Sequence, residues 1–355
     1  MKFAVIGAGN GGQAIAGYLG LNNYSVNLFD RSLDKVRALL SKGGIQLGGK
    51  IKGFGKINCI TNELSEAVQE VDVIMVTTVA NAHKELAMSL APLLCDNQIV
   101  ILNPGRTCGA LEFKQGLISA NCNKKIYIAE AQTLIYACRI KEPGVVNIIG
   151  VKDDVLLSAL PSSDTDFVLN KICTVYPCFS FAVNVLRTSF ENIGAIFHPC
   201  VILFNAATID RGNEFYFYRD MTPNIANFIE KFDAERIKVG KAYGVELLSV
   251  NEWISFAYKD TEGATLCEKM KNNPAYYDIL APSSIYTRQL MEDIPTGVLP
   301  MLELGKIAGI KMPLFESVLN ICSQLLNVDF RKEGRTLEHL GLKNMSKKEI
   351  LNYIQ

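Results

Sequence analysis

A glycine-rich turn, Gly7-Ala8-Gly9-Asn10-Gly11-Gly12, constrains the fold of this chain more than any other feature of its sequence. The apolar run before it is typical of a buried strand, and the residues after it have the pattern of a helix. In such a unit Gly7 allows a tight turn, Gly9 lets the backbone approach a pyrophosphate, and Gly12 lets the helix pack against the strand. The helix N-terminus then offers free N–H groups to the phosphates. The sequence therefore predicts the dinucleotide site of a Rossmann-type domain.

The next strand ends at Asp30, which bears on the identity of the dinucleotide. A carboxylate there accepts hydrogen bonds from both hydroxyls of the adenosine ribose, which favours NAD over NADP. Arg31 favours the opposite choice, because an arginine at this position can hold the 2′-phosphate of NADP. FAD shares the same first βαβ unit, and a glycine turn without a cofactor is the structural alternative. We predict NAD and leave NADP open.

Two later strands are followed by polar loops, Thr77-Thr78-Val79 and Asn103-Pro104-Gly105. In an open parallel sheet the ligand crevice lies beyond the carboxyl ends of the strands, so we expect these loops to border the nicotinamide. An ordinary loop explains any single residue among them equally well. The predicted cofactor contacts are Gly7, Ala8, Gly9, Asn10, Gly11, Gly12, Asp30, Arg31, Thr78, Asn103 and Pro104.

The first half of the chain alternates apolar runs with amphipathic stretches. The predicted strands are Phe3–Ile6, Val26–Phe29, Val71–Thr77, Ile99–Leu102 and Lys125–Ala129. The predicted helices are Gln13–Leu21, Leu33–Leu40, Glu63–Val68, Ala82–Leu93 and Leu111–Ser119. This order needs right-handed crossovers and gives a parallel sheet, which Val145–Val151 and Phe179–Leu186 are expected to extend. Residues 1–187 are thus predicted to form a doubly wound α/β domain of Rossmann type.

Beyond Arg187 the pattern changes to long helical stretches. Thr222-Pro223 is typical of an N-cap followed by proline in the first turn. Ser249-x-x-Glu252 and Ser346-x-x-Glu349 have the spacing of a capping box. Since 355 residues also exceed what one hydrophobic core usually serves, residues 188–355 are predicted to form a separate all-α domain.

Charge and cysteine content limit the class of protein. Lysine plus arginine equals aspartate plus glutamate at 36 each, so no net field draws the chain to nucleic acid or to an anionic membrane. The ten cysteines show no C-x-x-C pair and no histidines at zinc-finger spacing, so we expect reduced thiols, a cytoplasmic protein and no bound metal. The longest apolar run is shorter than the ~20 residues that span a bilayer, and no signal peptide is recognised at the N-terminus.

His198 stands out among the three histidines, because it lies between apolar residues at the start of the helical domain. One interpretation is a core histidine beside a helix kink. The other is an acid–base group at the domain interface, where the nicotinamide must lie. His83 is expected either as a residue at a helix start or at the edge of the cofactor site, and His339 is expected in a charged and solvated tail.

A second segment, residues 288–297, contains Arg288 and Asp293 and ends with proline and glycine. An arginine can bind a carboxylate substrate with two parallel hydrogen bonds. A carboxylate can orient the imidazole of His198 and favour its charged form. A surface ion pair at a helix end is the alternative that this spacing also produces.

In order along nearly the whole chain, these segments resemble the opine dehydrogenase family, which includes the octopine and nopaline dehydrogenases. The glycine turn carries the resemblance together with the Asn-x-x-x-x-x-His-Pro stretch at 192–199 and the Arg-x-x-x-x-Asp-x-Pro-x-Gly stretch at 288–297. The segment 136–139, Tyr-Ala-Cys-Arg, is also similar to one in that family. The resemblance implies that His198 and Asp293 form the catalytic pair of a helical substrate domain, and that Arg288 binds the carboxylate of a keto acid.

The resemblance also implies a reaction, the reductive condensation of an amino acid with a 2-keto acid such as pyruvate. Glu130, at the end of a strand, is a candidate contact for the amine or a cationic group of the amino acid, and a structural carboxylate at the sheet edge is the alternative. Tyr276 and Tyr277 either shape the same pocket or only pack. The expected partners are these small molecules, with neither nucleic acid nor membrane, for a monomer or a homodimer.

Two other hypotheses remain open from the sequence. Ketopantoate reductases and glycerol-3-phosphate dehydrogenases resemble this architecture but use a catalytic lysine, whereas Lys241 and Lys259 lie in plain amphipathic stretches. A regulator that binds a nicotinamide cofactor without catalysis would keep the glycine turn and Asp30. Such a regulator would not need His198, Arg288 and Asp293 together.

Overall fold

The computed structural model describes residues 1–258 and 261–355. The chain divides into two compact units, Met1–Thr188 together with Tyr353–Gln355, and Ser189–Asn352. Of the two lysines considered above, Lys241 is exposed near the end of a helix, and Lys259 lies outside the described residues. Within the described ranges, no helix combines the length and the apolar character that crossing a bilayer requires.

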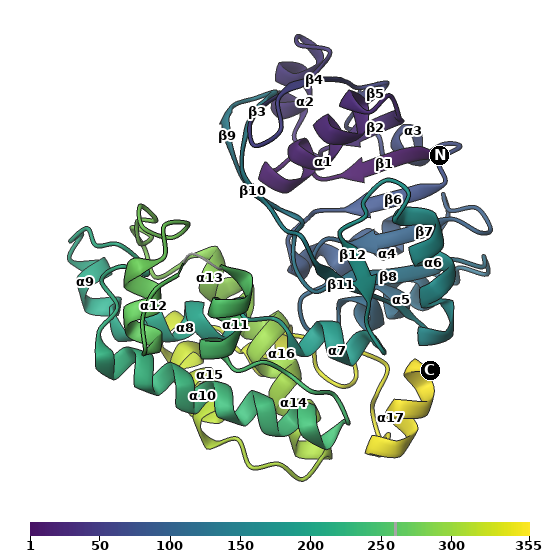
Figure 1. The fold of residues 1–355 in the computed structure, drawn as a ribbon. Coiled ribbons are helices and arrows are strands. Elements are labelled where there is room, and N and C mark those ends of the chain that lie inside the picture. The colour runs from purple at the N-terminus through teal and green to yellow at the C-terminus, as the bar shows by residue number, and fades with distance from the viewer. Residues whose placement is uncertain (259–260) are drawn as a thin grey trace. The chain divides into compact units, whose positions relative to one another are not determined.

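The first unit is built on an eight-stranded sheet with the order β12-β11-β8-β7-β6-β1-β2-β5 (Figure 1). Its strands are β1 (Lys2–Ile6), β2 (Ser25–Phe29), β5 (Cys59–Thr61), β6 (Val73–Val76), β7 (Ile99–Leu102), β8 (Tyr127–Ala131), β11 (Val155–Leu160) and β12 (Phe179–Phe181). All neighbours pair in parallel except β8 and β11, which are antiparallel. The order reverses at β1, which lies between β2 and β6, so a ligand crevice is expected where these strands end.

Helices connect these strands, as the alternating sequence pattern predicts. They are α1 (Asn10–Leu21), α2 (Leu33–Leu40), α3 (Leu64–Val68), η1 (Ala80–Ala82), α4 (His83–Leu90), α5 (Gly109–Ser119), η2 (Ser162–Asp164), α6 (Thr165–Ile172) and α7 (Val185–Phe190). The strands they cover are almost entirely buried, as in β6 and β7, where every residue is buried. A Rossmann-type sheet is therefore confirmed.

One of the sequence predictions about this sheet is wrong, and another is confirmed only in part, since β12 extends the sheet but is shorter than predicted. Val145–Val151 forms β10, but it belongs to a second sheet of four strands, β4-β3-β10-β9. The other members are β3 (Gly44–Gly49), β4 (Gly53–Lys56) and β9 (Tyr136–Glu142), which forms an antiparallel hairpin with β10. The run Phe179–Leu186 gives only the short strand β12, and α7 begins at Val185. Apolar runs of this length do not distinguish a strand from the start of a buried helix.

The second sheet contains glycines where the backbone of α1 approaches it closely. A Cβ at Gly55 of β4 would lie 2.0 Å from the carbonyl oxygen of Gly17, and a Cβ at Gly20 would lie 2.3 Å from that of Lys56. Only glycine lets helix and strand backbones come this close. The same glycines interrupt the alternation of apolar and polar side chains that predicts a strand. For this reason β3 and β4 were not predicted.

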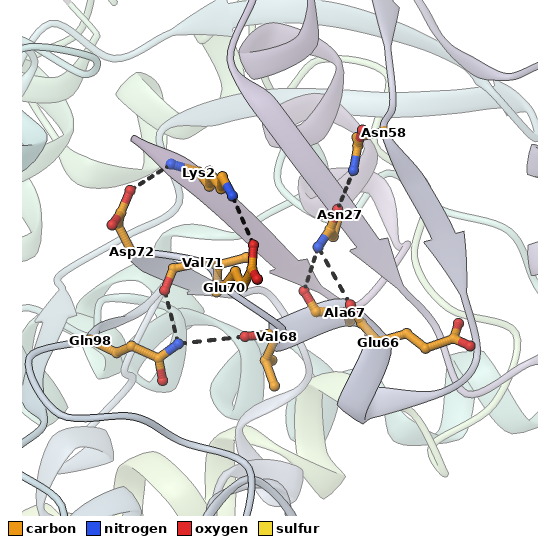
Figure 2. Close-up of polar contacts among 10 residues, drawn as sticks. All are labelled: Lys2, Asn27, Asn58, Glu66, Ala67, Val68, Glu70, Val71, Asp72 and Gln98. Atoms are coloured by element: carbon orange, nitrogen blue, oxygen red, sulfur yellow. Dashed lines mark hydrogen bonds and ion pairs between the residues drawn. The ribbon is translucent and has the colours of Figure 1, made fainter.

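Side-chain amides fasten the amino ends of the main sheet, at the edge opposite the glycine turn (Figure 2). Asn27 in β2 donates from Nδ2 to the carbonyl oxygen of Ala67 at 3.0 Å, which holds α3 against the sheet. Gln98 donates from Nε2 to the carbonyl oxygen of Val71 at 2.9 Å, just before β6. Both side chains are buried, so their hydrogen bonds satisfy polar groups that would otherwise be costly.

The second unit is helical, which confirms the predicted all-α domain. Its elements are α8 (Gly194–Phe204), α9 (Ala206–Asp210), α10 (Pro223–Ala242), α11 (Val250–Ala257), α12 (Leu266–Asn272), α13 (Arg288–Met291), the π-helical turn η3 (Ile294–Val298), α14 (Leu299–Ile307), α15 (Pro313–Leu326), α16 (Phe330–Glu333) and α17 (Lys347–Ile354), whose last residues join the first unit. The predicted caps are present, since Thr222 caps α10 and Ser249 forms a capping box with Glu252. Ser346 and Glu349 exchange the same contacts.

A buried ion pair on α10 holds this unit together. Arg236 is completely buried and donates from Nε to Asp233 Oδ1 at 2.6 Å. Its other nitrogens donate to the carbonyl oxygens of Phe190 at 2.8 Å and Leu248 at 2.6 Å. Asp233 accepts the N–H of Val250 at 2.8 Å with its second oxygen. One side chain thus joins α10 to two segments distant in sequence.

We expect Arg236→Ala to lower the free energy of unfolding by about 3–5 kcal/mol, because it leaves the buried Asp233 carboxylate without its partner. Urea unfolding followed by the fluorescence of the single tryptophan, Trp253 in α11, reports on this unit. Lys238→Ala on the same helix is the control, since Lys238 is exposed and its loss should change stability by under about 0.5 kcal/mol. Equal effects of the two variants would contradict the structural role of Arg236.

Candidate active site

The glycine turn has the geometry that a bound pyrophosphate requires. Gly7 has φ +105°, a conformation that other residues rarely adopt. A Cβ at Gly12 would lie 1.7 Å from the carbonyl oxygen of Gly7, so only glycine lets α1 start this close to β1. A Cβ at Gly9 would meet no described atom within 4 Å, so there is open space beside Gly9 for a pyrophosphate. These residues fit a dinucleotide, whose phosphates would lie at the N-terminus of α1.

Asp30 is positioned for a ribose. Its carboxylate is buried and accepts hydrogen bonds from the N–H of Ala8 at 2.9 Å and that of Ser32 at 3.0 Å. Lys35, at the start of α2, makes an ion pair with it at 3.3 Å. Arg31 is exposed beside it. The site thus offers a fixed carboxylate for ribose hydroxyls and two neighbouring cations that a 2′-phosphate would need.

The other predicted cofactor residues differ in their surroundings. Thr78 Oγ1 and Asn103 Oδ1 are buried and have no hydrogen-bond partner among the described residues, although both lie at carboxyl ends of strands that flank the crevice. Buried polar atoms of this kind need a partner, which a bound ligand can supply. Pro104 is half-buried next to Asn103. Asn10 instead accepts the N–H of Ile140 in β9 with its side chain at 2.8 Å, so that side chain supports the turn from the protein side.

A half-buried lysine, Lys152, lies close to the segment that packs on the glycine turn. Lys152 donates to the carbonyl oxygen of Leu134 at 2.7 Å, and the Leu134 side chain lies where a Cβ at Gly11 would be. Burial lowers the pKa of Lys152 to about 8. Cys138, in the Tyr-Ala-Cys-Arg segment, lies 3.3 Å from the carbonyl oxygen of Asn10. This segment therefore supports the cofactor turn rather than the helical unit.

In the helical unit, His198 and Asp293 are in direct contact. Nδ1 of His198 lies 2.6 Å from Oδ2 of Asp293, whose side chain is only 1% exposed. An ionised carboxylate can only accept, so Nδ1 carries the hydrogen and the lone pair of the neutral imidazole is at Nε2. A carboxylate in this place fixes the orientation of the ring and the position of the hydrogen on Nδ1. The pair has the composition of an acid–base centre.

Local sequence explains how the two side chains meet. Gly297 in η3 allows close packing on α8, because a Cβ there would lie 2.5 Å from Cβ of Ala195. The π-helical turn begins directly after Asp293, and π-turns often occur at functional sites. Pro199 follows His198 inside α8 and has no N–H to donate to the helix. The proline and glycine positions noted in the sequence thus shape both sides of the contact.

Arg288 begins α13, which packs on α8. Its Nη1 donates to Glu292 at 2.6 Å, while 55% of its side chain is exposed. Within residues 1–258 and 261–355, its other donors have no hydrogen-bond partner, so they are available to a carboxylate. The structure thus places Arg288 on the same short segment as Asp293. The Glu292 carboxylate fixes one edge of the Arg288 guanidinium.

Glu130 is fully buried at the end of β8. It accepts the N–H of Ala110 at 2.8 Å and the hydroxyl of Thr188 at 2.7 Å, all within the first unit. These contacts are those of a structural carboxylate at the sheet edge, which was the alternative that the sequence left open. The substrate-binding role of Glu130 stays a prediction. No described group of histidine, cysteine, aspartate or glutamate side chains is arranged to hold a metal ion.

Sequence reasoning did not find Tyr218. Its hydroxyl lies 3.1 Å from Nε2 of His198. Tyr218 belongs to an irregular segment, and the only signal in the sequence is the aromatic run Tyr216-Phe217-Tyr218. Lys35 and Glu292 were also missed, although each lies within a turn or so of the residue that it contacts.

Comparisons with known proteins agree with this arrangement. The family described as NAD/NADP octopine/nopaline dehydrogenase, alpha-helical domain, matches residues 182–326. The ketopantoate reductase family PanE/ApbA matches residues 3–107, within the cofactor unit. An opine dehydrogenase from Arthrobacter sp. (strain 1C) is 36% identical over 99% of this chain and 98% of its own length.

Solved structures show the same fold. An octopine dehydrogenase structure with NADH and L-arginine superposes with a TM-score of 0.83 at 20% identity, over 99% of this chain and 98% of that one. A yersinopine dehydrogenase with NADP+ bound superposes with a TM-score of 0.71 at 15% identity, over 100% and 97% of the two chains. Each superposition covers nearly all of both chains, so each of these proteins shares the fold of both units.

Proposed function

The chain belongs to the opine dehydrogenase family of NAD(P)-dependent oxidoreductases, and we propose that His198, Asp293 and Arg288 carry its substrate chemistry. Its activity is the NAD(P)H-dependent reductive condensation of an amino acid with a 2-keto acid, which gives an N-(carboxyalkyl) amino acid. The observation that carries the residue assignment is the 2.6 Å contact between Nδ1 of His198 and the buried carboxylate of Asp293. Pyruvate is the keto acid that we propose first.

His198 can serve each proton transfer of the condensation. The amine attacks the keto carbon, and a proton must leave the nitrogen and reach the oxygen. The resulting hydroxyl then departs as water when it receives a second proton, which leaves a protonated imine. A histidine oriented by Asp293 can carry the first proton from nitrogen to oxygen and, once it has been protonated again from solvent, donate the second. Bound NAD(P)H supplies the hydride that reduces the imine to the secondary amine.

The keto acid must be held while these transfers occur. We assign this to Arg288, whose planar guanidinium matches a carboxylate with two parallel hydrogen bonds. Glu292 fixes the guanidinium at 2.6 Å, so less conformational freedom is lost when the substrate binds. Correct placement of two reactants can lower the barrier by roughly 7–11 kcal/mol at best.

We expect Arg288→Ala to raise the KM for the keto acid roughly 10- to 100-fold, the range for losing charged hydrogen bonds. The KM for NADH should not change, because the cofactor residues lie elsewhere. Steady-state kinetics with the keto acid varied would measure the effect. Arg331→Ala is a matched control, since Arg331 makes a surface ion pair with Glu316 at 3.2 Å. A keto acid KM unchanged in Arg288→Ala would remove Arg288 from the substrate site.

NADH is the proposed cofactor, because the buried carboxylate of Asp30 lies where a 2′-phosphate would be repelled. We also propose a reducing, cytoplasmic compartment, since all ten cysteines are free thiols. A monomer or a homodimer is proposed for the assembly.

Oxidation of NADH and NADPH with pyruvate, with and without each of a panel of amino acids, tests this function. Oxidation that requires both substrates supports it. Oxidation with the keto acid alone would indicate a hydroxy-acid dehydrogenase, and cofactor binding without turnover would indicate a regulator.

A further inference from the structure

The ring nitrogen of His198 that faces away from Asp293 is hydrogen-bonded to a phenol. Nε2 lies 3.1 Å from the hydroxyl oxygen of Tyr218. Since Asp293 holds Nδ1, Nε2 is the nitrogen that gains and loses a proton during the reaction. The hydroxyl of Tyr218 is therefore bonded to the reactive nitrogen itself.

Aromatic contacts fix this phenol on several sides. Tyr218 stacks on Tyr276, with ring centroids 4.4 Å apart and an interplanar angle of 23°. Phe217 and Phe197 present their edges to it, with centroids at 4.7 Å and 6.2 Å. The residue is buried, so the hydroxyl has a defined direction. Its contact with His198 is thus held by the packing of the phenol ring.

Tyr276 links this phenol to the loop between α12 and α13. Its hydroxyl accepts that of Tyr258 at 2.9 Å, and burial raises the pKa of both tyrosines, so they stay neutral. The segment that carries Tyr218 also pairs with this loop, where Phe217 donates its N–H to the carbonyl oxygen of Ile279 at 2.7 Å. Two irregular segments therefore support one hydroxyl.

We propose that Tyr218 is a positioning residue, whose hydroxyl keeps Nε2 of His198 hydrogen-bonded in both protonation states of the imidazole. A hydroxyl donates to the neutral nitrogen and accepts from the protonated one. Asp293 accepts from Nδ1 in both states. The imidazole therefore keeps a hydrogen-bond partner at both nitrogens in either charge state, and only the hydrogen of the Tyr218 hydroxyl has to turn when the charge changes. This inference rests on the proposed function of His198.

Other titratable groups surround His198 on the elements that pack against α8. The Arg288–Glu292 pair lies on α13, and the Asp233–Arg236 pair lies on α10. Cys200, on α8 itself, lies near Cys322 of α15, and burial raises the pKa of both thiols. Glu292 and Asp233 are each paired with a cation, Arg288 and Arg236 respectively.

Tyr218→Phe tests the proposal, because it removes the hydroxyl and keeps the ring that stacks on Tyr276. We expect kcat to fall about 10-fold, the effect of losing one hydrogen bond to a charged group. The keto acid KM should stay within about two-fold, because Arg288 is untouched.

Imidazole nitrogen NMR gives a readout that is independent of turnover. The chain has three histidines, and we expect the Nε2 resonance of His198 to shift in Tyr218→Phe while those of His83 and His339 stay. Tyr243→Phe is the control, since it removes a hydroxyl that donates to the carbonyl oxygen of Leu304 at 3.0 Å in the same unit. An unchanged Nε2 resonance, or an unchanged kcat, in Tyr218→Phe would overturn the proposal. An inactive wild type would overturn the proposed function instead, while the resonance would still report on the contact.

Discussion

Replacing His198 by alanine is expected to lower kcat about 100- to 10,000-fold, the usual contribution of a general acid–base residue. Asp293→Asn should have a comparable effect, because an amide can donate to Nδ1 and so favours the wrong tautomer. The affinity for NADH should not change in either variant, since the glycine turn and Asp30 belong to the other unit. Rapid-mixing kinetics with NADH, pyruvate and the best amino acid would measure the chemical step.

His339→Ala is the matched control for this prediction. His339 donates from Nδ1 to the carbonyl oxygen of Gly334 at 2.8 Å and has no contact with His198 in the described part of the chain. We expect it to retain full turnover. If His198→Ala were as active as His339→Ala, the acid–base assignment would be wrong, whatever the substrate.

Alanine at Gly9 is expected to weaken NADH binding roughly 10- to 100-fold, or about 1.4–2.8 kcal/mol. Its added methyl group would lie in the open space where the phosphates pass the turn, and it meets no described protein atom within 4 Å. The free energy of unfolding should therefore change little. Fluorescence titration with NADH and thermal unfolding without it separate the two effects.

Two other glycines give this prediction its controls. Gly48→Ala in β3 has room for a methyl group, with the nearest atoms at 4.0 Å, so it should leave both binding and stability nearly unchanged. Gly12→Ala should lose both, because its Cβ would lie 1.7 Å from a backbone oxygen. Normal NADH affinity in Gly9→Ala would place the cofactor somewhere other than this turn.

The sequence predicted the parts of the fold in which one physical signal dominates. Strands such as β6 and β7 are buried on both faces, so they are continuous apolar runs. The caps at Thr222 and Ser249 were predicted because capping depends on a few neighbouring residues. Strands β3 and β4 were missed, because their glycines serve the packing of α1 rather than strand formation.

The candidate site was predictable to a different extent in each unit. The glycine turn follows from local chain geometry, so spacing alone indicates it. The association of His198 with Asp293 joins residues far apart in the sequence, so their residue types allowed it only as one of two interpretations, and the resemblance to a family then implied it. The contact of Tyr218 with His198 depends on how two irregular segments fold against each other, for which neither spacing nor periodicity gives a signal.

The most direct test of the central claim follows the hydride. With nicotinamide-deuterated NADH, pyruvate and the best amino acid, mass spectrometry of a single turnover would locate the deuterium. We predict a secondary amine that contains both substrates less one water, with deuterium on the former keto carbon. Deuterated lactate, or a product that lacks the amino acid, would contradict reductive condensation.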